Sequence, residues 1–164
     1  MCSKYTSRLT FTYDIQFGNV TRKLHTNTSW DQAKFEVCGH KWADLSEGSY
    51  GVSLMNDCKY GYSMKDRVMT QTLIKSGTEP NLTADQEHSF TYSLYPHAGT
   101  WREAGTVQEA LNLNVPAKAV FGAAEKDRME FLSADKRNVV LETVKKAEDG
   151  DGMIVRLYEV ENAR

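Results

Sequence analysis

Alternating hydrophobic and polar positions mark this chain as a β protein. From Leu9 to Phe17, hydrophobic residues occupy every second position, which is the spacing of a strand that buries one face. Gly18 and Asn19 interrupt this run, and residues 20–24 are predicted to return as the second arm of a hairpin. Further short β-type runs follow at 33–38, 51–55, 67–74, 89–95, 129–133, 138–146 and 153–159. About eight or nine short strands separated by turn signals predict a β-sandwich.

One segment has a different period. Between Arg102 and Leu111, hydrophobic residues recur at steps of three and four positions, which predicts a short helix. The segment Ala117–Asp127 is rich in small and charged residues and is predicted to be an exposed connection. The predicted fold class is therefore all-β, with at most one short helix.

Size and charge narrow the choice of partners. A chain of 164 residues can bury a core and fits one domain. Its formal net charge is −2, with no basic face or tail, which argues against nucleic acid and against an anionic membrane as partners. No stretch approaches the roughly 18 apolar residues of a membrane span, and no signal peptide is visible. Three cysteines without a paired spacing indicate free thiols, so we expect a cytoplasmic protein.

The richest chemistry lies between Asn27 and Tyr62, where tryptophans, acids and two Tyr-Gly pairs alternate with short β-type runs. A sugar needs a flat apolar face to lie on and acceptors for its hydroxyl groups, and these residue types supply both. The four histidines, in contrast, have no zinc-binding pattern. We therefore expect no metal site and no cofactor in this chain.

Asn27–Tyr62 resembles one known family, glycoside hydrolase family 38, the α-mannosidases, in the C-terminal β-domain of its cytosolic and bacterial branch. The resemblance is collinear from about Tyr13 to Glu159, and it includes the segments 90–99, 101–105, 140–148 and 155–159. It implies a large β-sandwich similar to galactose mutarotase, also called a supersandwich. Members of the family are much longer, so residues 1–164 resemble one partial C-terminal domain of a larger enzyme.

The resemblance also implies what the larger enzyme does. Such an enzyme hydrolyses terminal α-linked mannose with retention, which requires two carboxyl groups about 5–5.5 Å apart. In the family, the nucleophile and the divalent metal, zinc or cobalt, belong to the N-terminal catalytic domain. The expected partners are a mannose-containing oligosaccharide and that catalytic domain. Alone, the chain is predicted to be inactive and to self-associate.

Two predicted loops, Asp44–Tyr50 and Asn56–Tyr62, are the candidates for reaching the sugar cleft or the neighbouring domain. Tyrosines supply apolar faces with a hydroxyl, carboxylates and amides supply acceptors, and a lysine supplies a donor. The candidate residues are Asp44, Tyr50, Asn56, Asp57, Lys59 and Tyr60, and Tyr62 ends the second loop. For Asp44 and Asp57, capping of a turn is an equally weighted role.

Trp30 and Trp42 are predicted to form a core or to plug an interface between domains, rather than to stack on a sugar. We expect an exposed apolar surface around both. Two alternative functions remain open. The chain could be a free-standing carbohydrate-binding or interaction module. A mutarotase-like enzyme ranks last, because nothing in the sequence pairs the histidine acid and glutamate base that it needs.

Overall fold

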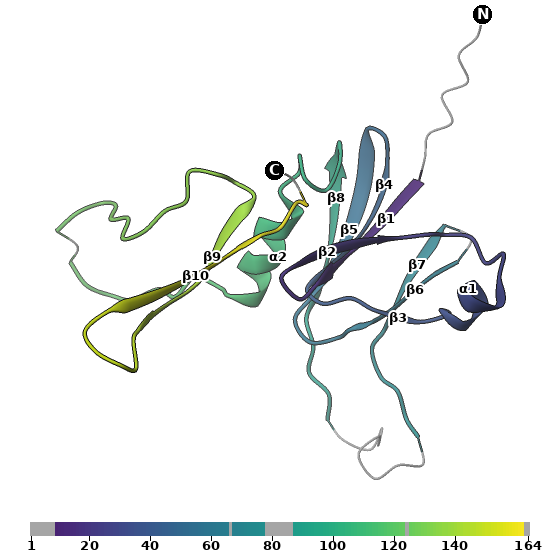
Figure 1. Cartoon of the computed structure of the whole chain (residues 1–164), viewed down its shortest axis with the longest axis horizontal. Coiled ribbons are helices and arrows are strands. Elements are labelled where there is room, and N and C mark those ends of the chain that lie inside the picture. The colour runs from purple at the N-terminus through teal and green to yellow at the C-terminus, as the bar shows by residue number, and fades with distance from the viewer. Residues whose placement is uncertain (1–8, 66, 78–86, 124, 163–164) are drawn as a thin grey trace, which may run out of the picture. The chain divides into compact units, whose positions relative to one another are not determined.

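The computed structural model describes residues 9–65, 67–77, 87–123 and 125–162 (Figure 1). The chain folds as two compact units. The first contains the residues up to Gln16 together with Val20–Pro116, and the second contains Phe17–Asn19 and the residues from Ala117 onward. The single partial domain predicted for residues 1–164 stays a prediction.

A five-stranded sheet forms the centre of the first unit, in the order β2-β1-β4-β5-β8. Its first two strands form the predicted hairpin, and Phe17 adopts a positive φ of 58° in the turn between them. Strand β1 pairs antiparallel with β4, β4 with β5, and β5 with β8. The strands are β1 (Leu9–Ile15), β2 (Gly18–Arg22), β4 (Trp42–Glu47), β5 (Tyr50–Asn56) and β8 (Tyr92–Ala98).

A second sheet of three strands packs against one face of the first sheet. Its strands are β3 (Val37–Cys38), β6 (Gly61–Lys65) and β7 (Val68–Thr72), in the order β3-β6-β7. The core between the two sheets contains Phe11, Tyr13, Ala43 and Tyr62, whose side chains are buried. Partly buried residues from both sheets, including Leu45 and Met64, complete this core. The predicted β-sandwich and the all-β fold class are confirmed.

Helix α2 (Thr106–Asn114) covers the other face of the five-stranded sheet and contacts β4 and β5 (Figure 1). Trp42, Met55, Trp101 and Ala110 form a second buried core beneath it. Trp42 is only 1% exposed, and its ring centroid lies 4.9 Å from that of Trp101. The prediction of an exposed surface around Trp42 is therefore wrong, because a helix covers that face of β4.

Trp30 behaves differently. It is 79% exposed and lies on α1 (Ser29–Ala33), a helix that the sequence pattern did not predict. This helix begins with a capping box, in which Thr28 accepts a hydrogen bond from the Asp31 backbone and the Asp31 side chain accepts one from the Thr28 backbone. With five residues and no buried position, α1 has no hydrophobic period to detect. The expectation of at most one short helix is corrected, since the described residues contain two, α1 and α2.

In the second unit, β9 (Val139–Lys146) and β10 (Met153–Glu159) form an antiparallel pair, as the sequence predicted. Asn19 extends this unit, since its side chain donates to the Val160 carbonyl oxygen at 2.6 Å. The run 129–133, which was predicted to be a strand, has no strand in the structure. Among the described helices, none is long and apolar enough to cross a membrane.

Candidate functional site

The structure separates the six candidate residues into three places. Asp44 and Asn56 are buried, at 0% and 1% exposure. Tyr50 is 55% exposed, but it begins the strand that Asn56 ends, so about 20 Å of extended chain separates the two. Asp57, Lys59 and Tyr60 follow Asn56 directly, in the connection from β5 to β6. The predicted first loop is instead the β4–β5 hairpin, in which Asp44 is a strand residue.

The buried amide of Asn56 shapes the β5–β6 connection. Its Oδ1 accepts a hydrogen bond from the Lys59 backbone at 2.5 Å, which closes the turn. Its Nδ2 donates to the His40 carbonyl oxygen at 2.8 Å and to the Tyr62 hydroxyl. Tyr62 is buried as well, and burial raises the pKa of its hydroxyl. Asn56 therefore positions the turn rather than offering its own amide to a ligand.

Asp57 ties this turn to the segment that enters β8. Its carboxylate accepts a hydrogen bond from the Thr91 backbone at 2.9 Å, and its own backbone donates to the Thr91 carbonyl oxygen at 3.2 Å. The hydrogen bond from the Thr91 backbone lowers the pKa of Asp57, because it stabilises the ionised form. The side chain is at the surface, so a fixed negative charge faces solvent here.

Two aromatic side chains, Phe90 and Tyr92, flank the residue whose backbone Asp57 binds. The Lys59 ammonium is 5.0 Å from the centroid of the Phe90 ring. The Phe90 and Tyr92 rings are stacked, with centroids 6.5 Å apart and an interplanar angle of 27°. Tyr92 is 56% exposed, and Tyr60 is 51% exposed. We call Asp57, Lys59, Tyr60, Phe90 and Tyr92 the turn cluster.

The turn cluster combines the groups that carbohydrate recognition uses. Exposed rings offer apolar faces, while a carboxylate and an ammonium group can accept and donate hydrogen bonds. Phe90 and Tyr92 were missed as site residues because they lie more than thirty positions after the turn. Their spacing of two in a β-type run, which places both on one side of a strand, was the available signal. Asp57 and Lys59 both contact the segment 90–92, whereas Asp44 and Tyr50 do not, and Tyr60 follows them in the sequence with its ring against His40.

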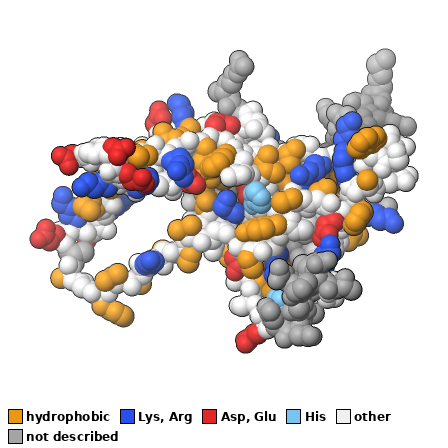
Figure 2. All heavy atoms as spheres, turned by 60° about the horizontal axis from the view of Figure 1, so that its bottom comes forward, with side chains coloured by type: hydrophobic (Ala, Val, Ile, Leu, Met, Phe, Trp, Pro, Cys, Tyr) orange, Lys and Arg blue, Asp and Glu red, His pale blue; other side chains and the backbone are white. Residues whose placement is uncertain are grey.

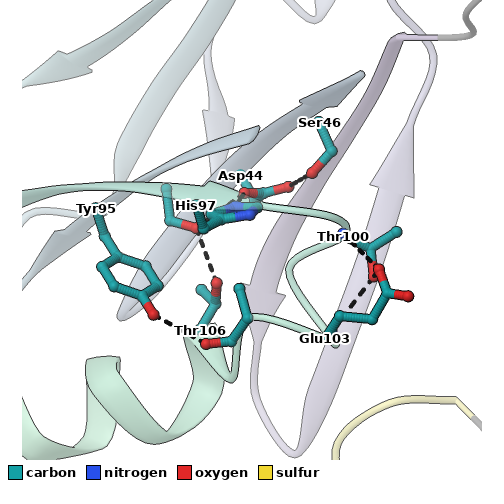
Figure 3. A network of polar contacts seen from close by, with 9 residues as sticks. Asp44, Ser46, Tyr95, His97, Thr100, Glu103 and Thr106 are labelled. Atoms are coloured by element: carbon teal, nitrogen blue, oxygen red, sulfur yellow. Dashed lines mark hydrogen bonds and ion pairs between the residues drawn. The ribbon is translucent and has the colours of Figure 1, made fainter. Parts of the chain in front are cut away.

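Asp44 belongs to a buried polar network beneath α2 (Figure 3). Its carboxylate lies 2.7 Å from His97 Nε2 and accepts hydrogen bonds from Ser53, at 2.8 Å, and from Ser46. Ser53 also lies 3.0 Å from the hydroxyl of Thr106, the first residue of α2. All of these side chains are at most 7% exposed. We call Asp44, Ser46, Ser53, His97 and Thr106 the helix network, because it attaches the start of α2 to the sheet.

Other polar contacts hold the segment that leads into α2. The Tyr95 hydroxyl donates to the Ala104 carbonyl oxygen at 2.9 Å, and the Glu103 carboxylate accepts from the Thr100 backbone at 2.8 Å (Figure 3). At the other end of the helix, the Asn114 amide donates to the Asn56 carbonyl oxygen at 3.0 Å. The helix is thus attached to the sheet at both ends, and its last residue contacts the residue that shapes the turn.

Among the described residues, no group of three or more His, Cys, Asp or Glu side chains is arranged to hold a metal ion. The His97 and Asp44 pair belongs to the helix network, and His25 contacts Asp31 at 3.3 Å. His88 is exposed, and His40 packs edge-on against the Tyr60 ring.

Comparison with known proteins identifies relatives over most of the chain. A model described as the glycosyl hydrolases family 38 C-terminal domain matches residues 5–83. A second, the glycosyl hydrolases family 38 C-terminal beta sandwich domain, matches residues 138–164. Alpha-mannosidase G from Dictyostelium discoideum is 45% identical over 153 residues, which are 90% of this chain and 14% of that protein. Alpha-mannosidase 2C1 from Homo sapiens is 44% identical over 154 residues, 90% of this chain and 15% of that protein.

A solved structure shows the same fold. The crystal structure of an alpha-mannosidase from Enterococcus faecalis V583 superposes with a TM-score of 0.74 at 19% identity. The match covers 92% of this chain and 19% of that one. The fold and the matches to the two family models together define the class: this is a β-sandwich region of the kind found in glycosyl hydrolases. The chain belongs to the C-terminal part of glycosyl hydrolase family 38, the α-mannosidases, and it spans 14–15% of the length of the curated relatives named here.

Proposed function

We propose that this chain is a segment of the C-terminal β region of an α-mannosidase that hydrolyses terminal α-D-mannose residues with retention. The observation that carries the proposal is identity of 44–45% with proteins named alpha-mannosidases, over 90% of this chain. The substrate of the longer protein is then a mannose-containing oligosaccharide. We also expect that protein to be cytoplasmic, where Cys38 and Cys58 would stay reduced as the free thiols seen here.

Within the longer protein, the segment has a supporting role. Retaining hydrolysis uses a pair of carboxyl groups at the scissile bond. Asp44 cannot contribute one at a surface cleft, because both of its oxygens accept hydrogen bonds inside the helix network. The nucleophile, the acid/base group and the zinc or cobalt ion would therefore come from the catalytic domain. The turn cluster would frame the sugar site by offering Tyr60 and Tyr92 as faces and Asp57 as an acceptor.

Packing on the catalytic domain is the second part of this role. Several large hydrophobic side chains of the first unit face solvent, including Trp30 at 79% and Leu94 at 66% exposure. Exposed apolar surface of this kind is the usual mark of an interface. It is also a reason to expect self-association of the isolated chain.

Steady-state kinetics of the full-length enzyme on an aryl α-mannoside and on a mannose oligosaccharide tests the framing role. Tyr60→Ala and Tyr92→Ala should raise KM for the oligosaccharide by about fivefold with little change in kcat, because they remove binding that is shared by ground and transition states. Val68→Ala, an exposed position on β7 outside the turn cluster, is the matched control. Unchanged KM in both tyrosine variants would contradict the framing role.

The isolated chain should show no turnover of an aryl α-mannoside, with or without added zinc or cobalt. Activity that copurifies with the chain, and that disappears when Asp57 is replaced, would contradict the supporting role. Saturable mannose binding by the isolated chain, without turnover, would instead favour the alternative of a carbohydrate-binding module. The exposed rings of the turn cluster are the observation that keeps this alternative open.

A further inference from the structure

A pocket of about 320 Å³ opens in the first unit, and no residue of the turn cluster lines it. Hydrophobic side chains of the sandwich core form its floor, among them Phe11, Tyr13 and Met64. Its size is at the lower end of the range for small-molecule sites. The pocket is distinct from both sets of polar residues described above.

Positive charge gathers around this pocket. Arg22, Lys23 and Lys34 line it, together with His25, while Asp31 is the one acidic residue in the lining. This excess contrasts with the whole chain, whose net charge is −2. Figure 2 shows Lys and Arg side chains next to hydrophobic ones on the face that it draws. The pocket is therefore locally cationic, with an apolar floor.

The charged side chains that line the pocket differ in whether neighbouring groups of this chain already neutralise them. Asp31 accepts from the Thr28 hydroxyl at 2.8 Å and lies 3.3 Å from His25 Nδ1. The Thr28 hydrogen bond lowers the pKa of Asp31, so this acid stays ionised and is matched by its own neighbours. In the part of the chain that the structure describes, Lys23 and Lys34 form no ion pair within 4 Å, and the charge of Lys34 contributes to the lowered pKa of Asp31.

Arg22 is held in place by the fold. Its Nη1 donates to the Cys38 carbonyl oxygen at 2.7 Å, and its guanidinium carbon lies 4.6 Å from the centroid of the Tyr13 ring. A guanidinium group carries five N–H donors, so one hydrogen bond to the backbone leaves most of them for a ligand. A fixed, planar donor group of this kind suits a phosphate or carboxylate.

We infer that this pocket binds a small organic anion, through a phosphate or carboxylate group held by Arg22, Lys23 and Lys34. The apolar floor would take the uncharged body of the molecule. The inference is independent of the proposed mannosidase role, since it rests on the lining of this pocket alone. Arg22 orients the anion, and the two lysines supply attraction that salt will screen.

Nuclear magnetic resonance titration of the ¹⁵N-labelled chain tests the inference. The probes are inorganic phosphate, acetate, a hexose 6-phosphate and the uncharged hexose. We expect saturable shifts at backbone amides of residues 21–26, 34 and 63–64 with phosphate, and weaker binding when sodium chloride rises from about 50 to 200 mM. Tighter binding of the hexose phosphate than of phosphate would show that the floor contributes, and tighter binding of acetate would assign a carboxylate ligand.

Matched variants make the result specific. Lys23→Gln and Lys34→Gln should each weaken phosphate binding by about threefold to fivefold, the range expected for one exposed charge pair. Lys65→Gln, an exposed lysine at the end of β6 that does not line the pocket, should leave binding within about twofold of the original. All three substitutions are at the surface, so the fold should survive them.

Three outcomes would overturn the inference. Shifts that grow without saturation would show only general ionic contact. Equal losses of phosphate affinity in Lys65→Gln and Lys23→Gln would show that the anion does not bind specifically at the pocket. Binding of the uncharged hexose at the same residues, as tight as that of its phosphate, would show that charge does not matter there.

Discussion

The helix network and the turn cluster differ in burial, although both draw on the part of the sheet where β5 pairs with β8. Each contains an aspartate, and each draws on β5 and β8 or on the residues next to them. Asp44 in the helix network is 0% exposed, and its carboxylate accepts from two hydroxyl groups and contacts His97. Asp57 in the turn cluster is at the surface and is held mainly by backbone hydrogen bonds.

This comparison shows that the face and end of a strand decide what a residue can do. Within the β5–β8 pair, Gly51 and Ser53 lie opposite His97 and Tyr95, on the face that α2 covers. Tyr92 and Leu94 alternate with these residues, so they lie on the other face of β8, where they are 56% and 66% exposed. The covered set therefore stabilises the fold, and the uncovered set is free to bind.

The largest expected effect concerns the two tryptophans. Trp42→Ala should lower the free energy of unfolding by about 3–5 kcal/mol, because it leaves a cavity between β4 and α2. Trp30→Ala should change it by less than about 0.5 kcal/mol, because that side chain is exposed. Urea denaturation followed by circular dichroism measures both. Equal losses would mean that Trp30 is buried in solution, for instance by self-association.

The second largest effect on the free energy of unfolding should come from replacing Asp44, the acceptor at the centre of the helix network. Asp44→Asn keeps the shape of the side chain but removes the charge that accepts from Ser46 and Ser53 and faces His97. Hydrogen bonds to charged groups are worth more than neutral ones, so we expect a loss of about 2–3 kcal/mol in the free energy of unfolding. Asp57→Asn is the matched control in the turn cluster and should cost clearly less. A similar loss in both variants would remove the distinction between the two sets.

A smaller loss of stability should follow from adding a side chain at Gly51, next to the His97 ring. A Cβ atom added at Gly51 would lie 2.7 Å from Ser46 Oγ and 2.8 Å from His97 Nε2, closer than real contacts allow. Gly51→Ala should therefore cost about 1–2 kcal/mol of stability and displace the His97 ring. Gly18→Ala is the control, since an added Cβ there meets no heavy atom within 4 Å. Stability of Gly51→Ala equal to that of the original chain would mean that the His97 ring is not held there.

Both strands of the second unit could be predicted from the sequence. β10 was predicted at Met153–Glu159, and β9 was predicted to within one residue, because regular β-type runs there end in clear turn signals. β4 was missed because both of its faces are covered, so buried Trp42 and Asp44 alternate with residues that are also mostly buried. Without an exposed face there is no polar alternation to detect.

The candidate site was predictable only in part for a related reason. The second predicted loop supplies Asp57, Lys59 and Tyr60 to the turn cluster, since residues adjacent in sequence stay adjacent in space. Phe90 and Tyr92 join them only through the pairing of β5 with β8, which a single sequence does not reveal. From the sequence alone, Asp44 and Asp57 had the same two possible roles, in a turn or at the sugar cleft. The local sequence does not predict that α2 covers Asp44.

The smallest expected effect is a pH dependence that belongs to the turn cluster. The Thr91 backbone hydrogen bond lowers the folded-state pKa of Asp57 below the ordinary value of an aspartate. Asp57 therefore adds stability that is complete above that value and is lost as the pH falls through the folded-state pKa. The stability difference between the original chain and Asp57→Asn should be small and constant from pH 5 to 7, and it should shrink as the pH is lowered toward 2. Asp31→Asn, at the other acid with a lowered pKa, is the control for effects of removing any such charge. A difference that stays constant down to pH 2 would show that Asp57 contributes through its shape rather than through its charge, and that the Thr91 hydrogen bond does not favour the ionised form.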